Sequence, residues 1–151
     1  MKSVLSAFLL ICIVFLSSAS FSLVPVTFEN QTGWVAYLDP QQSGHGSSVN
    51  YSGAPHPPIA ISGSATVNVS LTSYNAKQSR AWATFSYIFV KPDGTVEPCT
   101  IVLHFQIEKT HAAATLTSPS VTDVQCSSLI TVFYKLTNQE AFIYYQLKSE
   151  S

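Results

Sequence analysis

Apolar and polar side chains alternate with a period of two residues, and this pattern most constrains how the 151-residue chain can fold. In the clearest stretch, Cys99, Ile101, Leu103, Phe105 and Ile107 alternate with a mostly polar set. Successive side chains of a β-strand point to opposite faces, so the pattern predicts strands with one buried face. About eight segments have strand character: residues 24–29, 33–38, 65–71, 81–90, 99–107, 121–126, 129–136 and 141–147.

Together with the strand pattern, the length and composition of the chain predict its fold class. Charged residues make up 10% of the chain and aromatic residues 12%, a mixture that disfavours helices and suits half-buried sheet surfaces. The one Ala-rich stretch, residues 111–114, is expected to form a single helical turn or a loop. The sequence therefore predicts an all-β, single-domain antiparallel β-sandwich, Ig-like or jelly-roll-like, with about eight strands.

The N-terminal residues have the character of a secretory signal peptide. Lys2 precedes an apolar run from Val4 to Leu16, and small residues follow. A run of about 13 residues is too short to span the roughly 30 Å hydrocarbon core of a bilayer. We expect residues 1–20 to be removed and residues 21–151 to form the domain. The mature chain is expected to be extracellular or periplasmic, without stable membrane insertion.

Removal of this leader would also remove Cys12 and leave two cysteines, Cys99 and Cys126. In an oxidising compartment these two predict one disulfide bond. Closing a loop of about 28 residues stabilises a fold by roughly 3–4 kcal/mol in the chain-entropy description.

Several functional classes have no support in the sequence. The formal net charge is −1, and the basic residues are scattered singly, which argues against a nucleic-acid partner. No closely spaced pair of metal ligands, nucleophile motif or phosphate-binding glycine loop occurs, so we expect no metal, no cofactor and no enzymatic activity. A small metal-dependent or hydrolytic secreted enzyme is the third hypothesis, and it requires Asp39, His45 and His56 to converge.

A long Gly/Ser/Pro-rich segment, residues 39–58, has almost nothing to bury and is expected to be a functional loop. Aromatic residues lie beside it and on the outer faces of the expected strands, among them Trp82, Phe133 and Tyr144. On the strand of residues 81–90, the alternation directs Phe85, Tyr87 and Phe89 to the face opposite to Trp82. We therefore expect a non-enzymatic binding module that contacts an extracellular protein or glycan. The alternative is an assembly subunit that forms homo-oligomers through an exposed edge strand. The candidate binding residues are Trp34, Tyr37, His45, Tyr51, His56 and Trp82.

Three Asn-x-Ser/Thr sequences are candidate N-glycosylation sites if the source is eukaryotic: Asn30, Asn50 and Asn68. Asn68 is expected on the solvent face of its strand, and Asn50 falls in the long loop.

Overall fold

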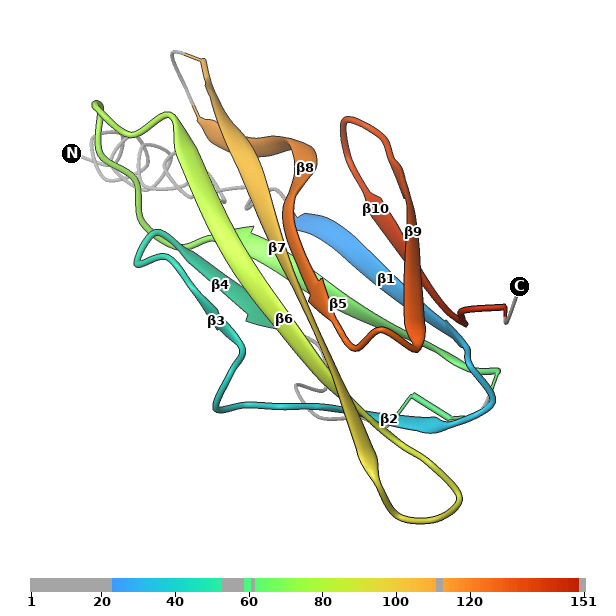
Figure 1. Cartoon of the computed structure of the whole chain (residues 1–151). Helices are drawn as coiled ribbons and strands as arrows, with labels where there is room; N and C mark the ends of the chain where they lie inside the picture. Colours follow the sequence, from blue (N-terminus) through green and yellow to red (C-terminus); the bar gives the residue numbers. More distant parts are fainter. Residues whose placement is uncertain (1–22, 53–58, 61, 111–112, 150–151) are drawn as a thin grey trace, which may run out of the picture.

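A computed structural model describes residues 23–52, 59–60, 62–110 and 113–149. The expected signal peptide, residues 1–20, and the candidate residue His56 lie outside the described residues. The described part is all-β and contains ten strands (Figure 1). They are β1 (Leu23–Gln31), β2 (Val35–Leu38), β3 (Gly44–His45), β4 (Val49–Ser52), β5 (Ser64–Leu71), β6 (Arg80–Val90), β7 (Val96–Lys109), β8 (Ala114–Cys126), β9 (Ile130–Leu136) and β10 (Ala141–Leu147).

The strands form two sheets. The first sheet has the order β4-β5-β1-β10-β9, and the second has the order β2-β6-β7-β8, with β3 also paired to β6. All strand pairs are antiparallel except β1 with β10, which run parallel. The prediction of an all-β, mostly antiparallel fold is confirmed, with β1 and β10 as the one parallel pair among the described strands. The two-residue alternation along β1 and β10 does not indicate whether the two strands run parallel or antiparallel.

The two sheets pack face to face in a sandwich-like arrangement with an aromatic core between them. Phe28 of the first sheet lies 5.1 Å from Phe85 and 5.0 Å from Tyr87 of the second, measured between ring centroids. Tyr145, also of the first sheet, lies 4.9 Å from Phe89. All five rings are buried, so the alternation along β6 assigned Phe85, Tyr87 and Phe89 to the inner face correctly.

The strand count exceeds the expected eight because β3 and β4 lie within the segment that was expected to be a loop. Val49 is buried in β4, but Gly44 and His45 have no apolar pattern. Their strand character comes from backbone pairing with Thr84 and Ala83 of β6. Backbone hydrogen bonds do not depend on side-chain hydrophobicity, so periodicity could not reveal these strands.

Strand β8 is longer than predicted and begins at Ala114 rather than at residue 121. Its first half has no clear alternation, and the pairing with β7 is interrupted by two register shifts. Ser118 has a φ of 49°, and its backbone N–H donates to the carbonyl of Asn138 in the β9–β10 turn. The start of β8 remains paired with β7, and β8 also contacts β1 and β5 of the other sheet.

The predicted disulfide bond between Cys99 and Cys126 is confirmed. The two residues lie directly opposite each other on β7 and β8. The bond therefore joins neighbouring strands of one sheet and does not cross the core between the sheets.

Candidate functional site

The described part of the long segment is held along the edge of β6. The N–H of Asp39 donates to the carbonyl of Ser86 at 2.7 Å, and the N–H of Ser86 donates to Ser43 Oγ at 3.0 Å. Further along, β3 pairs with β6, and the N–H of Gly46 donates to the carbonyl of Trp82 at 3.0 Å. Residues 39–46 therefore extend the second sheet instead of projecting as a free loop.

Trp82 is the most prominent side chain of this region. Its neighbours Ala81 and Ala83 face the core, so the strand period directs the Trp82 side chain to the outer face, where it is 42% exposed. Gly46 lies directly against the indole: a Cβ at this position would come within 3.1 Å of Trp82 Nε1. Glycine therefore allows a close approach of the backbone to one side of the indole, and a larger residue would push the ring by a few tenths of an ångström.

His45 and Tyr51 form a second contact beside Trp82. Their rings meet edge to face, with centroids 5.2 Å apart and an interplanar angle of 88°. His45 is exposed and its Nδ1 lies 2.9 Å from the carbonyl oxygen of Gly46. Tyr51 also packs on the buried Phe85 at 5.6 Å, so it anchors His45 to the core more than it offers a free surface.

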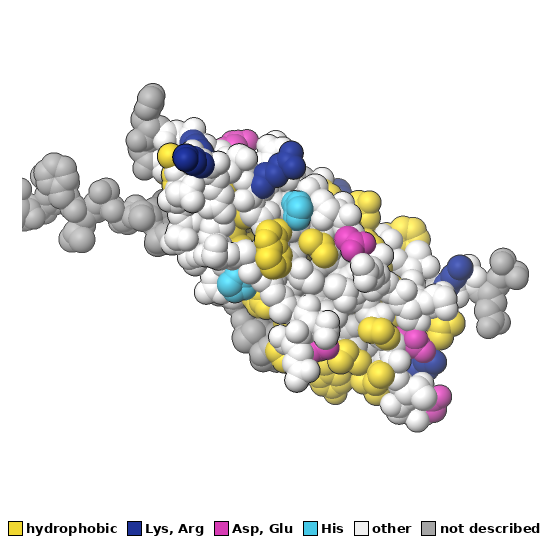
Figure 2. Space-filling view, turned by 60° about the vertical axis from the view of Figure 1, so that its left-hand side comes forward, with side chains coloured by type: hydrophobic (Ala, Val, Ile, Leu, Met, Phe, Trp, Pro, Cys, Tyr) yellow, Lys and Arg dark blue, Asp and Glu magenta, His cyan; other side chains and the backbone are white. Residues whose placement is uncertain are grey.

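A shallow depression lies next to Trp82 on the outer face. His104 of β7 is the cross-strand neighbour of Trp82, and Arg80 and Gln106 form the adjacent pair. The depression has a volume of about 150 Å³ and is lined by Arg80, His104, Phe105, Gln106, Ser120 and Thr122, so Trp82 borders it through His104 and is not part of its lining. Figure 2 shows this face, with two histidine side chains on either side of a hydrophobic side chain and a basic side chain close by.

Sequence reasoning placed His104 on the outer face of its strand but did not assign it or Arg80 to the site. The alternation of β6 and β7 was sufficient to show that Trp82 and His104 both face outward. The register that makes them neighbours is a property of the β6–β7 pairing and was not visible in either strand alone.

Trp34 and Tyr37 lie far from Trp82 in the structure. Tyr37 lies on the same outer face but opposite Ile88, six residues further along β6, which corresponds to about 20 Å. Trp34 is half-buried and packs against the core. Of the candidate binding residues that the structure describes, His45 and Tyr51 contact each other, and His45 pairs with the inward-facing Ala83, whereas Trp82 faces outward and is linked to them only through Gly46.

Trp34 belongs to a charged group at the disulfide end of the second sheet. Lys91 Nζ lies 5.7 Å above the Trp34 ring and forms an ion pair with Glu97 at 2.7 Å. The Ser127 hydroxyl also donates to Glu97, beside the disulfide bond. The hydrogen bonds from Lys91 and Ser127 lower the pKa of Glu97, and the bond to Glu97 raises the pKa of Lys91.

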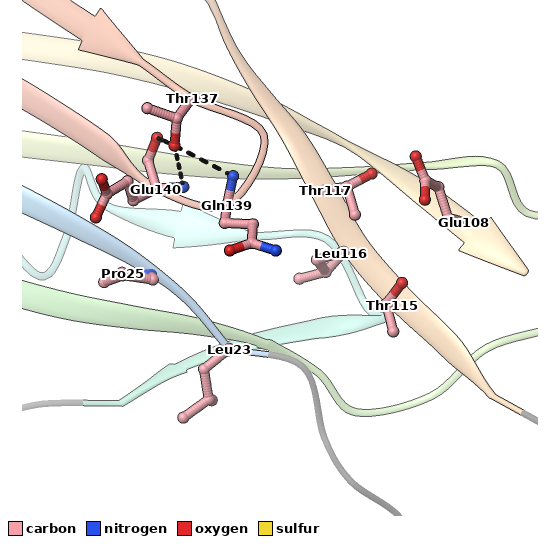
Figure 3. A pocket seen from close by; sticks show the side chains of 9 residues that line it. All are labelled: Leu23, Pro25, Glu108, Thr115, Leu116, Thr117, Thr137, Gln139 and Glu140. Carbon is pink, nitrogen blue, oxygen red and sulfur yellow. Dashed lines mark hydrogen bonds between the residues drawn. The ribbon is translucent and has the colours of Figure 1, made fainter.

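A larger pocket of about 720 Å³ lies at the opposite end of the molecule, where β1 begins and the β9–β10 turn approaches β8 (Figure 3). Sequence reasoning did not predict it. Glu108 and Glu140 line it, and Figure 3 shows their carboxylates on opposite sides of the pocket. Among the described residues neither carboxylate has an ion-pair partner. The two groups do not converge on one point, as a pair of catalytic carboxylates would.

The metal-site alternative receives no support from the described residues. Within them, no three His, Cys, Asp or Glu side chains come together. Asp39 Oδ1 instead accepts the N–H of Gln41 at 2.9 Å and closes a local turn. Since His56 lies outside the described residues, convergence of Asp39, His45 and His56 stays a prediction.

Comparison with known proteins adds no assignment. No protein-family model matches this chain, and no curated protein or solved structure is significantly similar to it. The described residues also contain no helix long and apolar enough to cross a membrane.

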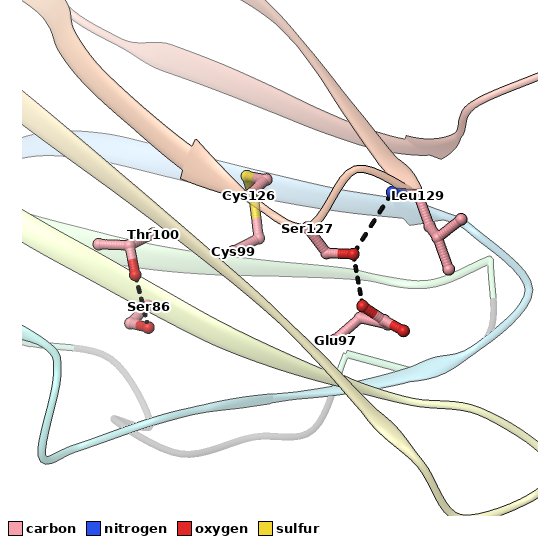
Figure 4. The surroundings of a disulfide bond; sticks show 7 residues. All are labelled: Ser86, Glu97, Cys99, Thr100, Cys126, Ser127 and Leu129. Carbon is pink, nitrogen blue, oxygen red and sulfur yellow. Dashed lines mark hydrogen bonds between the residues drawn. A yellow bond between two sulfur atoms is a disulfide. The ribbon is translucent and has the colours of Figure 1, made fainter.

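The surroundings of the disulfide bond show how firmly the neighbouring strands are tied. Figure 4 shows Ser127 between Glu97 and the backbone N–H of Leu129, and Thr100 donating to Ser86 Oγ at 2.9 Å. These bonds link β6, β7 and the β8–β9 turn.

Proposed function

We propose that the protein is a secreted, non-enzymatic module that binds a neutral glycan on the outer face of its second sheet. The observation that carries this proposal is the exposed indole of Trp82, supported by Gly46 and adjoining a polar depression. An exposed aromatic ring offers an apolar surface to the C–H face of a sugar ring, while nearby polar groups orient its hydroxyls.

The depression supplies the polar groups. Arg80, His104, Gln106, Ser120 and Thr122 present guanidinium, imidazole, amide and hydroxyl groups beside Trp82. Its volume of about 150 Å³ equals roughly five water molecules at about 30 Å³ each, which suits a small part of a glycan chain. Arg80 is the one basic residue in this lining, so a neutral glycan fits better than a polyanion.

Affinity electrophoresis of the mature, oxidised protein in gels containing soluble β-glucan, xylan or mannan, with pull-down on chitin and cellulose, tests the proposal. We expect retardation or retention by at least one polysaccharide. Trp82→Ala should raise Kd at least tenfold, or about 1.4 kcal/mol. Gly46→Ala should weaken binding without removing the ring, because the added methyl displaces the indole. Full binding by Trp82→Ala, or no binding of any of these glycans by the folded protein, would refute the proposal.

Self-association through an edge strand is the second candidate, and a specific observation favours it. Val124 of β8 and Tyr134 of β9 lie opposite inward-facing residues, yet they are 40% and 51% exposed. Phe133, on the other face of β9, is 52% exposed. The edge formed by β9 thus carries apolar side chains on both faces, and such an edge can pair with a second copy.

Sedimentation velocity over a range of protein concentrations distinguishes the two candidates. A Phe133→Lys variant should abolish self-association if it occurs through β9 and should leave glycan binding unchanged. A wild-type protein that remains monomeric at all concentrations would eliminate the second candidate.

Export and the finer fold class are part of the same proposal. A disulfide bond is compatible with an oxidising compartment, which supports secretion after loss of residues 1–20. The bond joins strands of one sheet, unlike the inter-sheet bond of antibody domains, which favours a jelly-roll-like over an Ig-like sandwich. Intact mass of the secreted protein would locate the processed N-terminus.

A further inference from the structure

The three Asn-x-Ser/Thr sequences occupy different environments in the folded protein. Asn30 is the penultimate residue of β1 and lies in the interior, whereas Asn50 and Asn68 lie on the neighbouring strands β4 and β5. An N-linked glycan needs an asparagine amide that reaches solvent in the folded state.

Asn30 is fully buried and its side-chain amide holds three segments together. Nδ2 donates to the carbonyls of Trp34, Ile59 and Ala60. Oδ1 accepts the N–H and the hydroxyl of Thr32 at 3.1 and 2.7 Å. The threonine that completes the glycosylation sequence is therefore itself part of this buried network. A glycan on Nδ2 would displace these carbonyl partners and separate the segments.

Asn50 and Asn68 face outward. Asn50 is exposed and follows the buried Val49, while Asn68 lies between the buried Val67 and Val69, so its side chain is on the outer face of the first sheet. In the β4–β5 pairing, Asn50 is opposite Ser70, which places Asn68 at the diagonal position. Diagonal neighbours lie about 7–8 Å apart, so the two sites share one patch of this face.

We propose that, in a secretory pathway that attaches N-linked glycans, the folded protein carries glycans at Asn50 and Asn68 and none at Asn30. In this reaction a bond forms between the first sugar carbon and Nδ2. The bond from that carbon to the diphosphate of a lipid-linked oligosaccharide donor breaks, and the amide proton leaves with the lipid diphosphate. The inference rests on the export included in the proposed function.

The consequence is a division of the surface. The two glycans would cover the outer face of the first sheet at β4 and β5, whereas Trp82 lies on the outer face of the second sheet. Modification would therefore leave the proposed glycan-binding face open. Chains modified at Asn30 would be unable to form the buried network and would be lost from the folded population.

The test is secretion of the full chain from eukaryotic cells, with intact mass and peptide mapping before and after enzymatic removal of N-glycans. We expect two occupied sites, Asn50 and Asn68. Asn50→Gln and Ser52→Ala should each remove the same single glycan, and Asn68→Gln and Ser70→Ala should each remove the other. The matched pairs separate loss of the acceptor from loss of the recognition sequence.

A second form, with a host secretion leader in place of residues 1–20, keeps the result independent of the native leader. If this form is secreted and the native form is not, the export proposal fails and the glycan assignment is read from the host-leader form. A glycan on Asn30 of the folded protein, or secreted protein with bare Asn50 and Asn68, would overturn the inference.

Discussion

Replacing Tyr145 by Phe should stabilise the protein, although the residue lies at the centre of the core. Tyr145 is fully buried and its ring packs on Phe28, Tyr87 and Phe89. Within the part of the chain that the structure describes, however, its hydroxyl has no hydrogen-bond partner. A buried unsatisfied polar group costs about 1–3 kcal/mol. Phe keeps the ring contacts and removes that cost, so we expect a gain of about 1 kcal/mol at neutral pH.

The stabilisation by Tyr145→Phe should increase at alkaline pH. Burial, together with the neighbouring Tyr87, raises the pKa of Tyr145 well above its ordinary value, and burial raises the pKa of Tyr87. Above about pH 10 these tyrosines ionise only in the unfolded state, so stability is present below that pH and decreases as pH rises. In this range each tyrosine lowers the free energy of unfolding by about 1.4 kcal/mol per pH unit. Tyr145→Phe removes one of the two contributions and should be about 2.4 kcal/mol more stable than wild type at pH 11.

Urea unfolding with the disulfide intact, at pH 7 and at several values between 9 and 11, measures both effects. Tyr144→Phe is the matched control, because it makes the same substitution at the adjacent residue, whose side chain lies on the outer face. It should change the free energy of unfolding by less than about 0.5 kcal/mol. Destabilisation by Tyr145→Phe at neutral pH, or an unchanged alkaline slope, would show that the hydroxyl is satisfied in solution and would refute the reasoning.

Three further predictions concern the strands around the outer face of the second sheet. Removing the Cys99–Cys126 bond, which closes a separation of 27 residues, should lower the free energy of unfolding by about 3.6 kcal/mol in urea titrations of the double alanine variant. A loss below about 1 kcal/mol would mean that the β7–β8 hairpin persists in the unfolded state. Ser118→Val should destabilise the fold by about 1–3 kcal/mol because φ is 49°, whereas Ser118→Gly should be tolerated; equal melting temperatures for the two variants would contradict this. Because hydrogen bonds from Lys91 and Ser127 lower the pKa of Glu97, their contribution to stability is present above the ordinary carboxyl pKa and is lost as pH falls through the lowered value. Glu97→Gln should therefore flatten the decline of Tm on acidification, and an unaltered decline would exclude this contribution.

Many of the residues that face the core could be predicted from the sequence alone. The approximate positions of eight of the ten described strands, except for the first half of β8, the inward direction of Phe85, Tyr87 and Phe89, and the disulfide bond followed from local alternation and from the count of cysteines. The candidate site could be predicted only in part. Trp82 was assigned to an outer face, but its neighbours Gly46, Arg80 and His104 depend on strand pairing.

The sequence by itself determined which side chains face the core, because the two-residue period of a strand is a local property of the backbone. The tertiary structure decided which strands are neighbours and in which register. Backbone hydrogen bonds are nearly the same in any pairing, so the choice depends on how side chains from distant segments pack together and on the geometry of the turns. It paired Gly44 and His45 with β6, placed β1 parallel to β10, and buried Asn30 among carbonyls of the chain. The same choice placed His104 beside Trp82 and so formed the face to which we assign glycan binding.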